Sequence, residues 1–267
     1  MINVIVAGAA GRMGSRLIAL IKESSALAPA GAIEGKGHPA LGLDAGETAG
    51  VGKMGVLITD DLSALLDRAE VVIDFSAPEA TLGHLRAVAE RRRAMVIGTT
   101  GFTAAQLDEL KSLTRKVPCV FSPNMSVGVN LIYKVITEMA RILGDEYDIE
   151  VIEAHHRLKK DAPSGTALKI AEVLARAVDR DLNQVGVYAR KGLVGERKKQ
   201  EIGIQTIRAG DIVGDHTILF GGMGERIEVT HRASSRDTFA RGALRAASWV
   251  VRQPPGLYDM MDVLNLK

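Results

Sequence analysis

The sequence predicts an α/β protein with a Rossmann-like parallel-sheet domain plus a second α+β domain built on a mixed or antiparallel sheet. Over the first 125 residues, short apolar runs alternate with longer amphipathic stretches. A glycine-rich segment follows the first apolar run. Beyond residue 125 the rhythm changes, and β-patterned runs follow one another with only short polar turns between them. With 267 residues, the chain is long enough for two such domains.

The first domain is predicted from continuous apolar runs, which are typical of strands buried on both faces of a parallel sheet. The helices between them have apolar residues at helical spacing, as at Met13, Leu17, Leu20 and Ile21. Pro78 suits a first helical turn. The expected strands are 2–7, 28–34, 56–59, 71–76, 95–99 and 119–122, and the expected helices are 13–22, 78–92 and 103–115.

The second domain is predicted to begin near residue 125 with one long helix, 126–143, which Gly144 ends. Turn residues such as Gly210-Asp211 and Gly221-Gly222 separate its last β-patterned runs, and consecutive strands with short connections indicate antiparallel pairing. Its expected strands are 149–154, 203–208, 216–220 and 226–231, and its other expected helices are 164–178 and 236–252.

Composition excludes several classes of protein. The 34 basic and 32 acidic residues give a net charge of +2, and only 10 residues are aromatic (Phe 5, Tyr 4, Trp 1), so no nucleic-acid partner is expected. The single cysteine, Cys119, excludes an internal disulfide framework and a cysteine-rich zinc module, and it is expected to be a buried thiol. No apolar run reaches the roughly 18 residues of a membrane span, and the N-terminus does not resemble a signal peptide. The sequence therefore predicts a cytoplasmic protein without a membrane or metal site.

A glycine loop joins the first predicted strand to the first helix. Gly8-Ala9-Ala10-Gly11-Arg12-Met13-Gly14 has the spacing G-x-x-G-x-x-G, a variant of the dinucleotide-binding fingerprint. Glu34 follows Gly14 by 20 residues, at the end of the second strand, where an acidic residue accepts hydrogen bonds from a ribose. Lys36 offers a positive charge to a 2′-phosphate, so both NADH and NADPH are candidate cofactors. The alternative is a tight strand–helix turn with an unrelated surface glutamate.

Two further turns follow buried strands at the edge where this fold binds ligands. They are Gly98-Thr99-Thr100 and Ser122-Pro123-Asn124. Their small and polar residues are candidates for the nicotinamide side of the crevice, although simple turn chemistry also explains them.

The densest polar segment of the second half is Glu153-Ala154-His155-His156-Arg157-Leu158-Lys159-Lys160. Histidine exchanges a proton near neutral pH, and lysine donates a proton or binds an anion. Ser164, Gly165 and Thr166 begin the next predicted helix, where hydroxyl and N–H groups suit a carboxylate. A solvated basic loop with Ser164 or Thr166 as a helix cap is the alternative. The remaining histidines are predicted to be surface or structural residues: His38, His84, His216 and His231.

Across these segments the sequence resembles the dihydrodipicolinate reductase (4-hydroxy-tetrahydrodipicolinate reductase) family of lysine and diaminopimelate biosynthesis. The similarity spans nearly the whole chain. It is carried by the glycine loop, Val72–Ser76, Val96–Phe102, Asn124–Asn130, the His155-His156-Arg157 segment with Lys159, Asp161–Ala167, Arg208–Gly214 and the segment from His231 to Arg236.

The resemblance implies an NAD(P)H-dependent reductase that acts on a small cyclic dicarboxylate. It implies that His155 is the catalytic acid/base, that Lys159 is its partner, and that His156 with the Ser164-Gly165-Thr166 turn binds the substrate carboxylate. It adds Met125, where some members have an aromatic residue, to the cofactor contacts. It further implies a homotetramer and a cofactor domain formed by residues 1–125 and 236–267, with residues 126–235 as the substrate and oligomerisation domain.

One departure concerns the cofactor. Some family members carry an arginine directly after the ribose-binding acid, and Gly35 stands there in this sequence. Two other functions remain as alternatives: another nicotinamide-dependent dehydrogenase of amino-acid metabolism, and a cofactor-sensing binding protein without catalysis.

Overall fold

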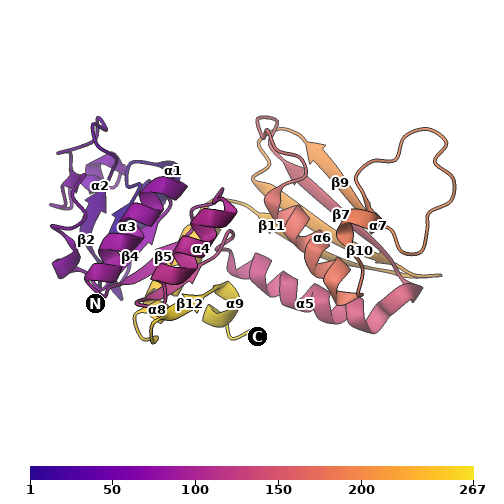
Figure 1. Cartoon of the computed structure of the whole chain (residues 1–267). Coiled ribbons are helices and arrows are strands. Elements are labelled where there is room, and N and C mark those ends of the chain that lie inside the picture. The colour runs from indigo at the N-terminus through magenta and orange to yellow at the C-terminus, as the bar shows by residue number, and fades with distance from the viewer. The chain divides into compact units, whose positions relative to one another are not determined.

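The computed structural model describes residues 1–267, and the chain divides into two compact units. Unit 1 consists of residues 1–127 and 236–267, and unit 2 of residues 128–235 (Figure 1). None of the helices has the length and apolar character needed to cross a bilayer.

Unit 1 is built on a seven-stranded sheet with the strand order β12-β6-β5-β4-β1-β2-β3. Every neighbouring pair is parallel, which confirms the predicted fold class. The strand order reverses between β1 and β4, the point at which this class of fold binds its ligands. The strands are β1 Ile2–Ala7, β2 Leu27–Ile33, β3 Ile58–Thr59, β4 Val71–Asp74, β5 Ala94–Ile97, β6 Pro118–Phe121 and β12 Gly256–Tyr258.

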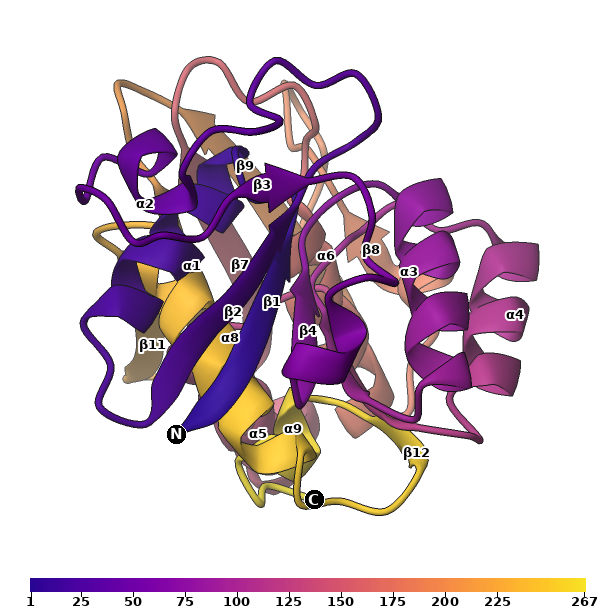
Figure 2. The same cartoon turned by 90° about the vertical axis from the view of Figure 1, so that its left-hand side faces the viewer.

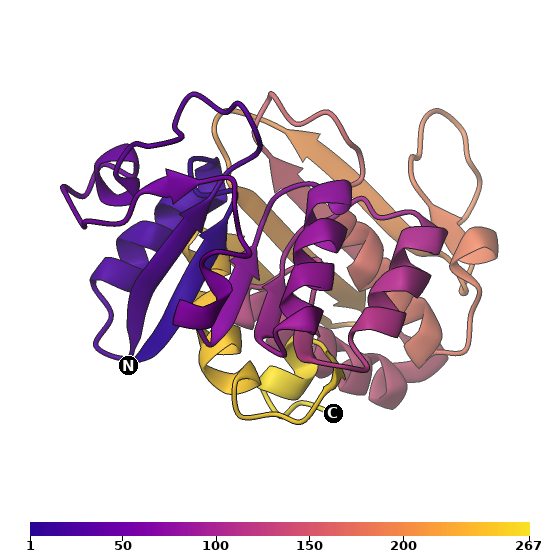
Figure 3. The same cartoon turned by 60° about the vertical axis from the view of Figure 1, so that its left-hand side comes forward.

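Helices cover both faces of this sheet, and each face has its own apolar core. Figure 2 shows α1 and α8 on one face and α3 and α4 on the other. The C-terminal segment returns to unit 1, and both termini lie at the end of the sheet where β1 begins (Figure 3). The helices are α1 Arg12–Lys22, α2 Ala45–Thr48, α3 Pro78–Glu90, α4 Ala104–Leu113, α8 Asp237–Val250 and α9 Met260–Val263, with a 3₁₀ turn at Leu66–Arg68.

Unit 2 is built on a five-stranded sheet with the order β11-β10-β7-β9-β8. One face of it packs against α5 and α6 and forms a third apolar core. The strands are β7 Asp148–His155, β8 Gly186–Val187, β9 Ile202–Arg208, β10 Gly214–Gly221 and β11 Arg226–Ala233, and the helices are α5 Val127–Leu143, α6 Gly165–Ala177 and α7 Leu182–Val185, with a 3₁₀ turn at Gly144–Glu146.

The second sheet is mixed, which confirms the predicted fold class, but the antiparallel pairing expected between the consecutive runs 203–208 and 216–220 does not occur. β7 pairs with β10 in antiparallel orientation but with β9 in parallel orientation. Residues 209–213 therefore pass over the end of β7 to join two strands that are not neighbours. Two strand spacings amount to about 10 Å, a distance that five extended residues span easily. A short connection thus did not require adjacent strands.

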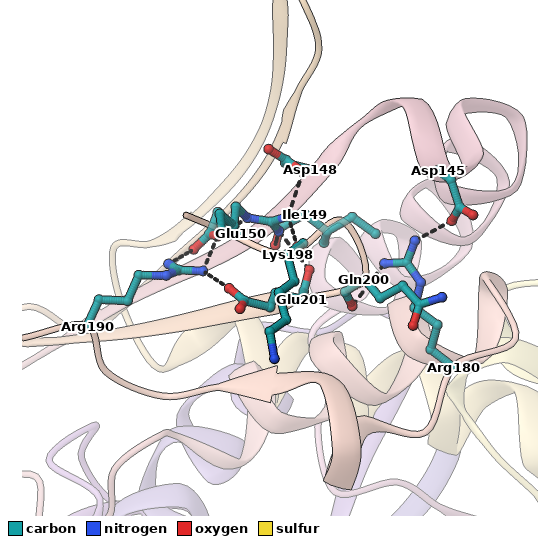
Figure 4. A network of polar contacts seen from close by, with 10 residues as sticks. Asp145, Asp148, Ile149, Glu150, Arg180, Arg190, Lys198, Gln200 and Glu201 are labelled. Carbon is teal, nitrogen blue, oxygen red and sulfur yellow. Dashed lines mark hydrogen bonds and ion pairs between the residues drawn. The ribbon is translucent and has the colours of Figure 1, made fainter. Parts of the chain in front are cut away.

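The long loop between β8 and β9 is tied to β7 by ion pairs (Figure 4). Both carboxylate oxygens of Glu150 accept from Arg190, at 2.9 and 3.0 Å, and Arg197 Nε donates to Glu150 at 3.1 Å. Arg190 also contacts Glu201 at the start of β9. This network lies on the face of β7 opposite to α6.

Candidate active site

The glycine loop turns sharply from β1 into α1. Gly8 has a φ of +74°, which glycine adopts without strain, and the backbone N–H groups of Gly8 and Ala9 donate to the Ile33 carbonyl at 2.9 and 3.0 Å. Gly11 is the N-cap of α1 and supplies no capping side chain. The start of α1, with Arg12 and Met13 in its first turn, therefore has backbone donors and the positive end of the helix dipole available for a phosphate.

Glu34 lies directly after β2 and is bound to this loop. Its Oε1 accepts from Ala10 N at 2.7 Å, and its Oε2 accepts from Gly35 N at 3.3 Å. Lys36 is exposed, and a Cβ at Gly35 would meet no atom within 4 Å. The structure thus places Glu34 beside the glycine loop, with open space at the position after it.

The Gly98-Thr99-Thr100 turn is held by a buried polar cluster at the end of β4. Thr99 Oγ1 accepts from Ser76 N at 3.1 Å and from Thr81 Oγ1 at 2.8 Å, so its side chain is already engaged. The fully buried Asp74 accepts from Ser76 and pairs with His84 Nδ1 at 2.7 Å. His84 is therefore structural, as predicted, and Thr99 offers only its backbone to a ligand.

The Ser122–Met125 turn follows β6. Ser122 Oγ donates to the Asn124 carbonyl at 2.8 Å, and Asn124 Oδ1 accepts from Ser126 N at 2.9 Å, while Pro123 is exposed. The side chain of Met125 packs in the core of unit 1 and is only 1% exposed. In this conformation the side chain of Met125 lies in the core, and its carbonyl packs closely against Gly242 of α8.

Cys119 lies in β6 and is fully buried, as predicted. Burial, together with the negative charge of Asp74, raises the pKa of its thiol far above the ordinary value. No three His, Cys, Asp or Glu side chains are grouped so that they could hold a metal ion.

The candidate proton-transfer site lies at the carboxyl end of β7. Glu153 and His155 are two residues apart and point to the same face of the strand, and both are buried. His155 Nδ1 lies 2.6 Å from Glu153 Oε2. The two terminal nitrogens of Arg208 form a bidentate pair with Glu153 at 2.8 and 2.9 Å.

Lys159 follows a turn rather than an extended segment. β7 ends at His155, Arg157 N donates to the Gly210 carbonyl, and Lys159 N donates to the His156 carbonyl. His155, Arg157 and Lys159 therefore do not share a strand face. The ammonium of Lys159 is 2.9 Å from Asp161 Oδ1, and its hydrogen bond is the main cause that lowers the pKa of that carboxyl.

Ser164 is the N-cap of α6, and its Oγ accepts from Ala167 N at 3.2 Å. The same oxygen contacts His216 Nε2 at 3.2 Å, and Ser164 N donates to Glu153 Oε1 at 3.0 Å. Gly165 and Thr166 form the first turn of α6, where the helix dipole favours an anion. The Ser164–Thr166 turn is thus bound to the same glutamate as His155.

Three residues that the sequence did not identify complete this site: Glu153, Arg208 and His216. His216, predicted to be a surface or structural residue, is buried beside the candidate site, because β10 pairs with β7 and places it opposite Glu153, with its ring centroid 5.3 Å from that of His155. Burial, and after it the electrostatic effect of the neighbouring His155, lower the pKa of His216 to about 4. The contacts of Arg208 and His216 with this site depend on the pairing of strands that are distant in sequence.

Comparison with known proteins places this geometry in a family. The family models "Dihydrodipicolinate reductase, N-terminus" and "Dihydrodipicolinate reductase, C-terminus" match residues 2–125 and 128–264. The chain belongs to the dihydrodipicolinate reductase family. The 4-hydroxy-tetrahydrodipicolinate reductases of Syntrophus aciditrophicus (strain SB) and Syntrophobacter fumaroxidans (strain DSM 10017 / MPOB) are 55% and 57% identical to it, each over 267 residues and 100% of both chains.

A solved structure of the family supports the fold. The dipicolinate-bound dihydrodipicolinate reductase from Paenisporosarcina sp. TG-14 superposes with a TM-score of 0.75, covers 98% of both chains and is 24% identical. The resemblance read from the sequence motifs is therefore confirmed, and the chain is an oxidoreductase of this NAD(P)H-dependent family.

Proposed function

We propose that this chain catalyses the NAD(P)H-dependent reduction of dihydrodipicolinate, formed from 4-hydroxy-tetrahydrodipicolinate, to tetrahydrodipicolinate. This is a cytoplasmic step of lysine and diaminopimelate biosynthesis. The observation that carries the proposal is the placement of His155 against a buried carboxylate at the end of β7, in the half of the chain that matches the C-terminal family model.

The dinucleotide is proposed to bind unit 1 at the point where the strand order reverses. The uncapped start of α1 and the glycine loop fit a pyrophosphate, and Glu34 fits a ribose hydroxyl pair. A bound reduced nicotinamide supplies the hydride. The residues proposed to hold the cofactor are Gly8, Ala9, Ala10, Gly11, Arg12, Met13, Glu34, Lys36, Gly98, Thr99, Thr100, Ser122, Pro123, Asn124 and Met125.

The chain's own residues are proposed to complete the reduction by delivering a proton. Addition of a hydride to C4 of the conjugated ring leaves an electron pair that C3 shares, and a proton must reach C3 to saturate it. His155 delivers this proton from Nε2, because Nδ1 is held by Glu153. Lys159 keeps a positive charge nearby through its pair with Asp161 and stabilises the charge that develops on the substrate.

The substrate carboxylates are proposed to bind at His156 and at the Ser164-Gly165-Thr166 turn. The first turn of α6 presents N–H groups and the positive end of a 13-residue helix, a favourable place for an anion. Holding the dicarboxylate at both ends fixes the ring in one orientation and so restricts which carbon atom reacts.

The first test is a coupled assay. A separate synthase condenses pyruvate with aspartate semialdehyde, and the protein is added with NADH or NADPH while the absorbance of the reduced cofactor is followed. Oxidation that requires the synthase product supports the proposal. Cofactor binding without oxidation contradicts it and favours a cofactor-sensing protein, while oxidation with a different carbonyl substrate favours another amino-acid dehydrogenase.

Two substitutions test the proposed residues directly. His155→Gln and Lys159→Met are each expected to lower kcat by about 100-fold or more, with little change in the Kd of NADH measured by fluorescence. Lys169→Met is the matched control, because Lys169 is an exposed lysine of α6 that pairs only with Glu172. Unchanged turnover in both test variants would remove these residues from the mechanism.

A homotetramer built through unit 2 is proposed as the assembled state. One face of the second sheet packs on α5 and α6, and on the opposite face Ile207 is 47% exposed. Ile207 is the apolar position of this face at which a contact with another subunit is tested. Light scattering on the wild type and on Ile207→Glu tests this, since a charge at such an interface is expected to reduce the assembled mass.

A further inference from the structure

We propose that Glu153 is the positioning residue for His155, so that one buried carboxylate fixes both the proton-exchanging nitrogen of His155 and the start of α6. This inference rests on the proposed function of His155. Glu153 touches no reacting atom in this account, and it acts through the two groups that it binds.

The carboxylate of Glu153 has donors at both oxygens. Oε2 faces His155 Nδ1 at 2.6 Å and one nitrogen of Arg208 at 2.8 Å. Oε1 accepts from the other Arg208 nitrogen at 2.9 Å, from Ser164 N at 3.0 Å and from Thr206 Oγ1 at 3.3 Å. An ionised carboxylate only accepts hydrogen bonds, so His155 Nδ1 must be the donor. The neutral ring therefore has its lone pair on Nε2.

Arg208 ensures that the glutamate does not compete for the proton. Burial by itself raises the pKa of Glu153, but the hydrogen bonds from Arg208, His155 and Ser164 outweigh it and hold that pKa below the ordinary value. The carboxylate thus stays ionised while His155 gains and loses its proton. A bidentate arginine also fixes the plane of the carboxylate, and with it the plane of the imidazole.

The far side of the His155 ring is shaped by β10. A Cβ at Gly214 would lie 3.0 Å from His155 Nε2, so glycine leaves space at the nitrogen that exchanges the proton. The ring of His216 packs edge-on against that of His155, and its pKa of about 4 keeps it neutral near neutral pH. The charged or titratable groups next to His155 are Glu153 on β7, which Arg208 on β9 also binds, and His216 on β10. His231 on β11 and Lys159, which pairs with Asp161 in the turn after β7, act electrostatically on His216.

The same carboxylate also sets the turn that is proposed to bind the substrate. Because Ser164 N donates to Glu153, the N-cap of α6 is attached to the strand that carries His155. Movement of Glu153 would displace the proton donor and the carboxylate-binding turn together. A single buried group therefore couples substrate orientation to proton delivery.

Glu153→Gln separates this role from simple charge removal. Arg208, Ser164 and Thr206 all donate to the position of Oε1, so the glutamine oxygen is expected there and its NH₂ group faces His155. His155 Nδ1 must then accept, so the neutral ring carries its only proton on Nε2. Loss of that proton would leave an imidazolate, and protonation of Nδ1 would point an N–H group at the NH₂ group of the glutamine. The ring can therefore no longer donate from Nε2 and end as the neutral Nδ1–H form.

Glu150→Gln is the matched control. Glu150 lies on the same strand but on the opposite face, where it is held by Arg190 and Arg197 (Figure 4). Burial raises its pKa, whereas the hydrogen bonds from Arg190 and Arg197 lower it by more, as in Glu153. The two variants remove equivalent charges from one strand, and only one of them changes the surroundings of His155.

Two measurements on the full chain decide the proposal. Ring-nitrogen NMR at alkaline pH, with His155 assigned from His155→Gln, is expected to find the Nδ1–H tautomer in the wild type and in Glu150→Gln, and the Nε2–H tautomer in Glu153→Gln. Steady-state assays with the synthase product are expected to find kcat about 100-fold lower in Glu153→Gln, and within about threefold of wild type in Glu150→Gln.

Several results would overturn the positioning role. They are an Nε2–H tautomer in the wild type, an unchanged tautomer or kcat in Glu153→Gln, and an equal loss of kcat in both variants. If Glu153→Gln does not fold, Glu153→Asp retains the charge but is one methylene shorter, and it is expected to shift the tautomer and to lower kcat to an intermediate value. The tautomer measurement needs no turnover, so a wild type with Nδ1–H but no reductase activity contradicts the proposed function alone.

Discussion

Replacing Gly14 with alanine tests whether the close approach of α1 to β1 supports both folding and cofactor binding. Glycine in a helix interior is less stable than alanine by about 0.5–1 kcal/mol, so helix propensity alone predicts a gain in stability. A Cβ at Gly14, however, would lie 2.0 Å from the Gly8 carbonyl oxygen and 2.7 Å from Ala9 Cα. Both contacts are backbone atoms that cannot rotate away.

The cost follows from the displacement that this Cβ requires. To bring the shorter contact from 2.0 Å to the 3.0 Å limit of real contacts, α1 must move about 1 Å from the glycine loop. Overpacking of this kind costs about 1–3 kcal/mol, and the upper end applies because the obstacle is backbone. After the propensity gain is subtracted, the free energy of unfolding is expected to fall by about 2 kcal/mol.

Gly83→Ala is the control, because Gly83 lies inside α3 and a Cβ there meets no atom within 4 Å. Urea unfolding is expected to show Gly83→Ala stabilised by about 0.5–1 kcal/mol and Gly14→Ala destabilised. The affinity for NADH, titrated by fluorescence, is expected to fall about tenfold or more in Gly14→Ala only. The reasoning is refuted if Gly14→Ala is stabilised as Gly83→Ala is and binds NADH normally.

Three further predictions concern charge and burial. Gly35→Arg is expected to improve the kcat/KM for NADPH about tenfold without loss of stability, because the space around a Cβ at Gly35 is open and an arginine there can meet a 2′-phosphate. An unchanged ratio of the kcat/KM for NADPH to that for NADH would contradict this. Burial lowers the pKa of His216 from 6.5 to about 4. Between these two pH values the unfolded chain binds more protons than the folded chain does. The free energy of unfolding of the wild type is therefore expected to fall by up to about 3 kcal/mol as the pH is lowered from 6.5 to about 4. Urea unfolding of His216→Gln against pH should not show that loss, whereas a slope equal to that of the wild type would assign it to other groups. The buried thiol of Cys119, whose pKa is raised by burial, is expected to resist a disulfide reagent in the native protein and to react fully in denaturant; rapid reaction in native buffer would show that β6 opens.

The first sheet was predictable because its strands are buried on both faces. Such strands are continuous apolar runs in the sequence, as in Val71–Asp74 and Ala94–Ile97, and the expected ranges differ from the observed ones mainly at their ends. β12 escaped prediction because Gly256–Tyr258 is only three residues long and follows two prolines, so that its pairing with β6 at the sheet edge has no local signal.

The parts of the site that depend on local chain order were also predictable. The glycine loop and its position before α1 follow from spacing, and Ser164 was recognised as a possible cap of the following helix. The pairing of Glu153 with Arg208 was not predictable in this way, since the two residues are 55 positions apart and meet only because β9 runs parallel to β7. Contacts between strands depend on register, which a single sequence does not give when the connections allow more than one strand order.

The register of β7 with β9 and β10 also links the apolar core of unit 2 to the candidate site. Along the helix-facing side of three neighbouring strands, the residues are apolar at one end and polar at the other, and the change occurs at the same level in each strand. A shift of one residue in β7 would turn Glu153 and His155 to the opposite face and would expose Ile149 and Val151. Burial of the apolar half therefore fixes the placement of the polar half, so that the stability of the sheet maintains the geometry of the site. The aligned levels are Ile149 with Ile202 and Phe220, Val151 with Ile204 and Ile218, Glu153 with Thr206 and His216, and His155 with Arg208.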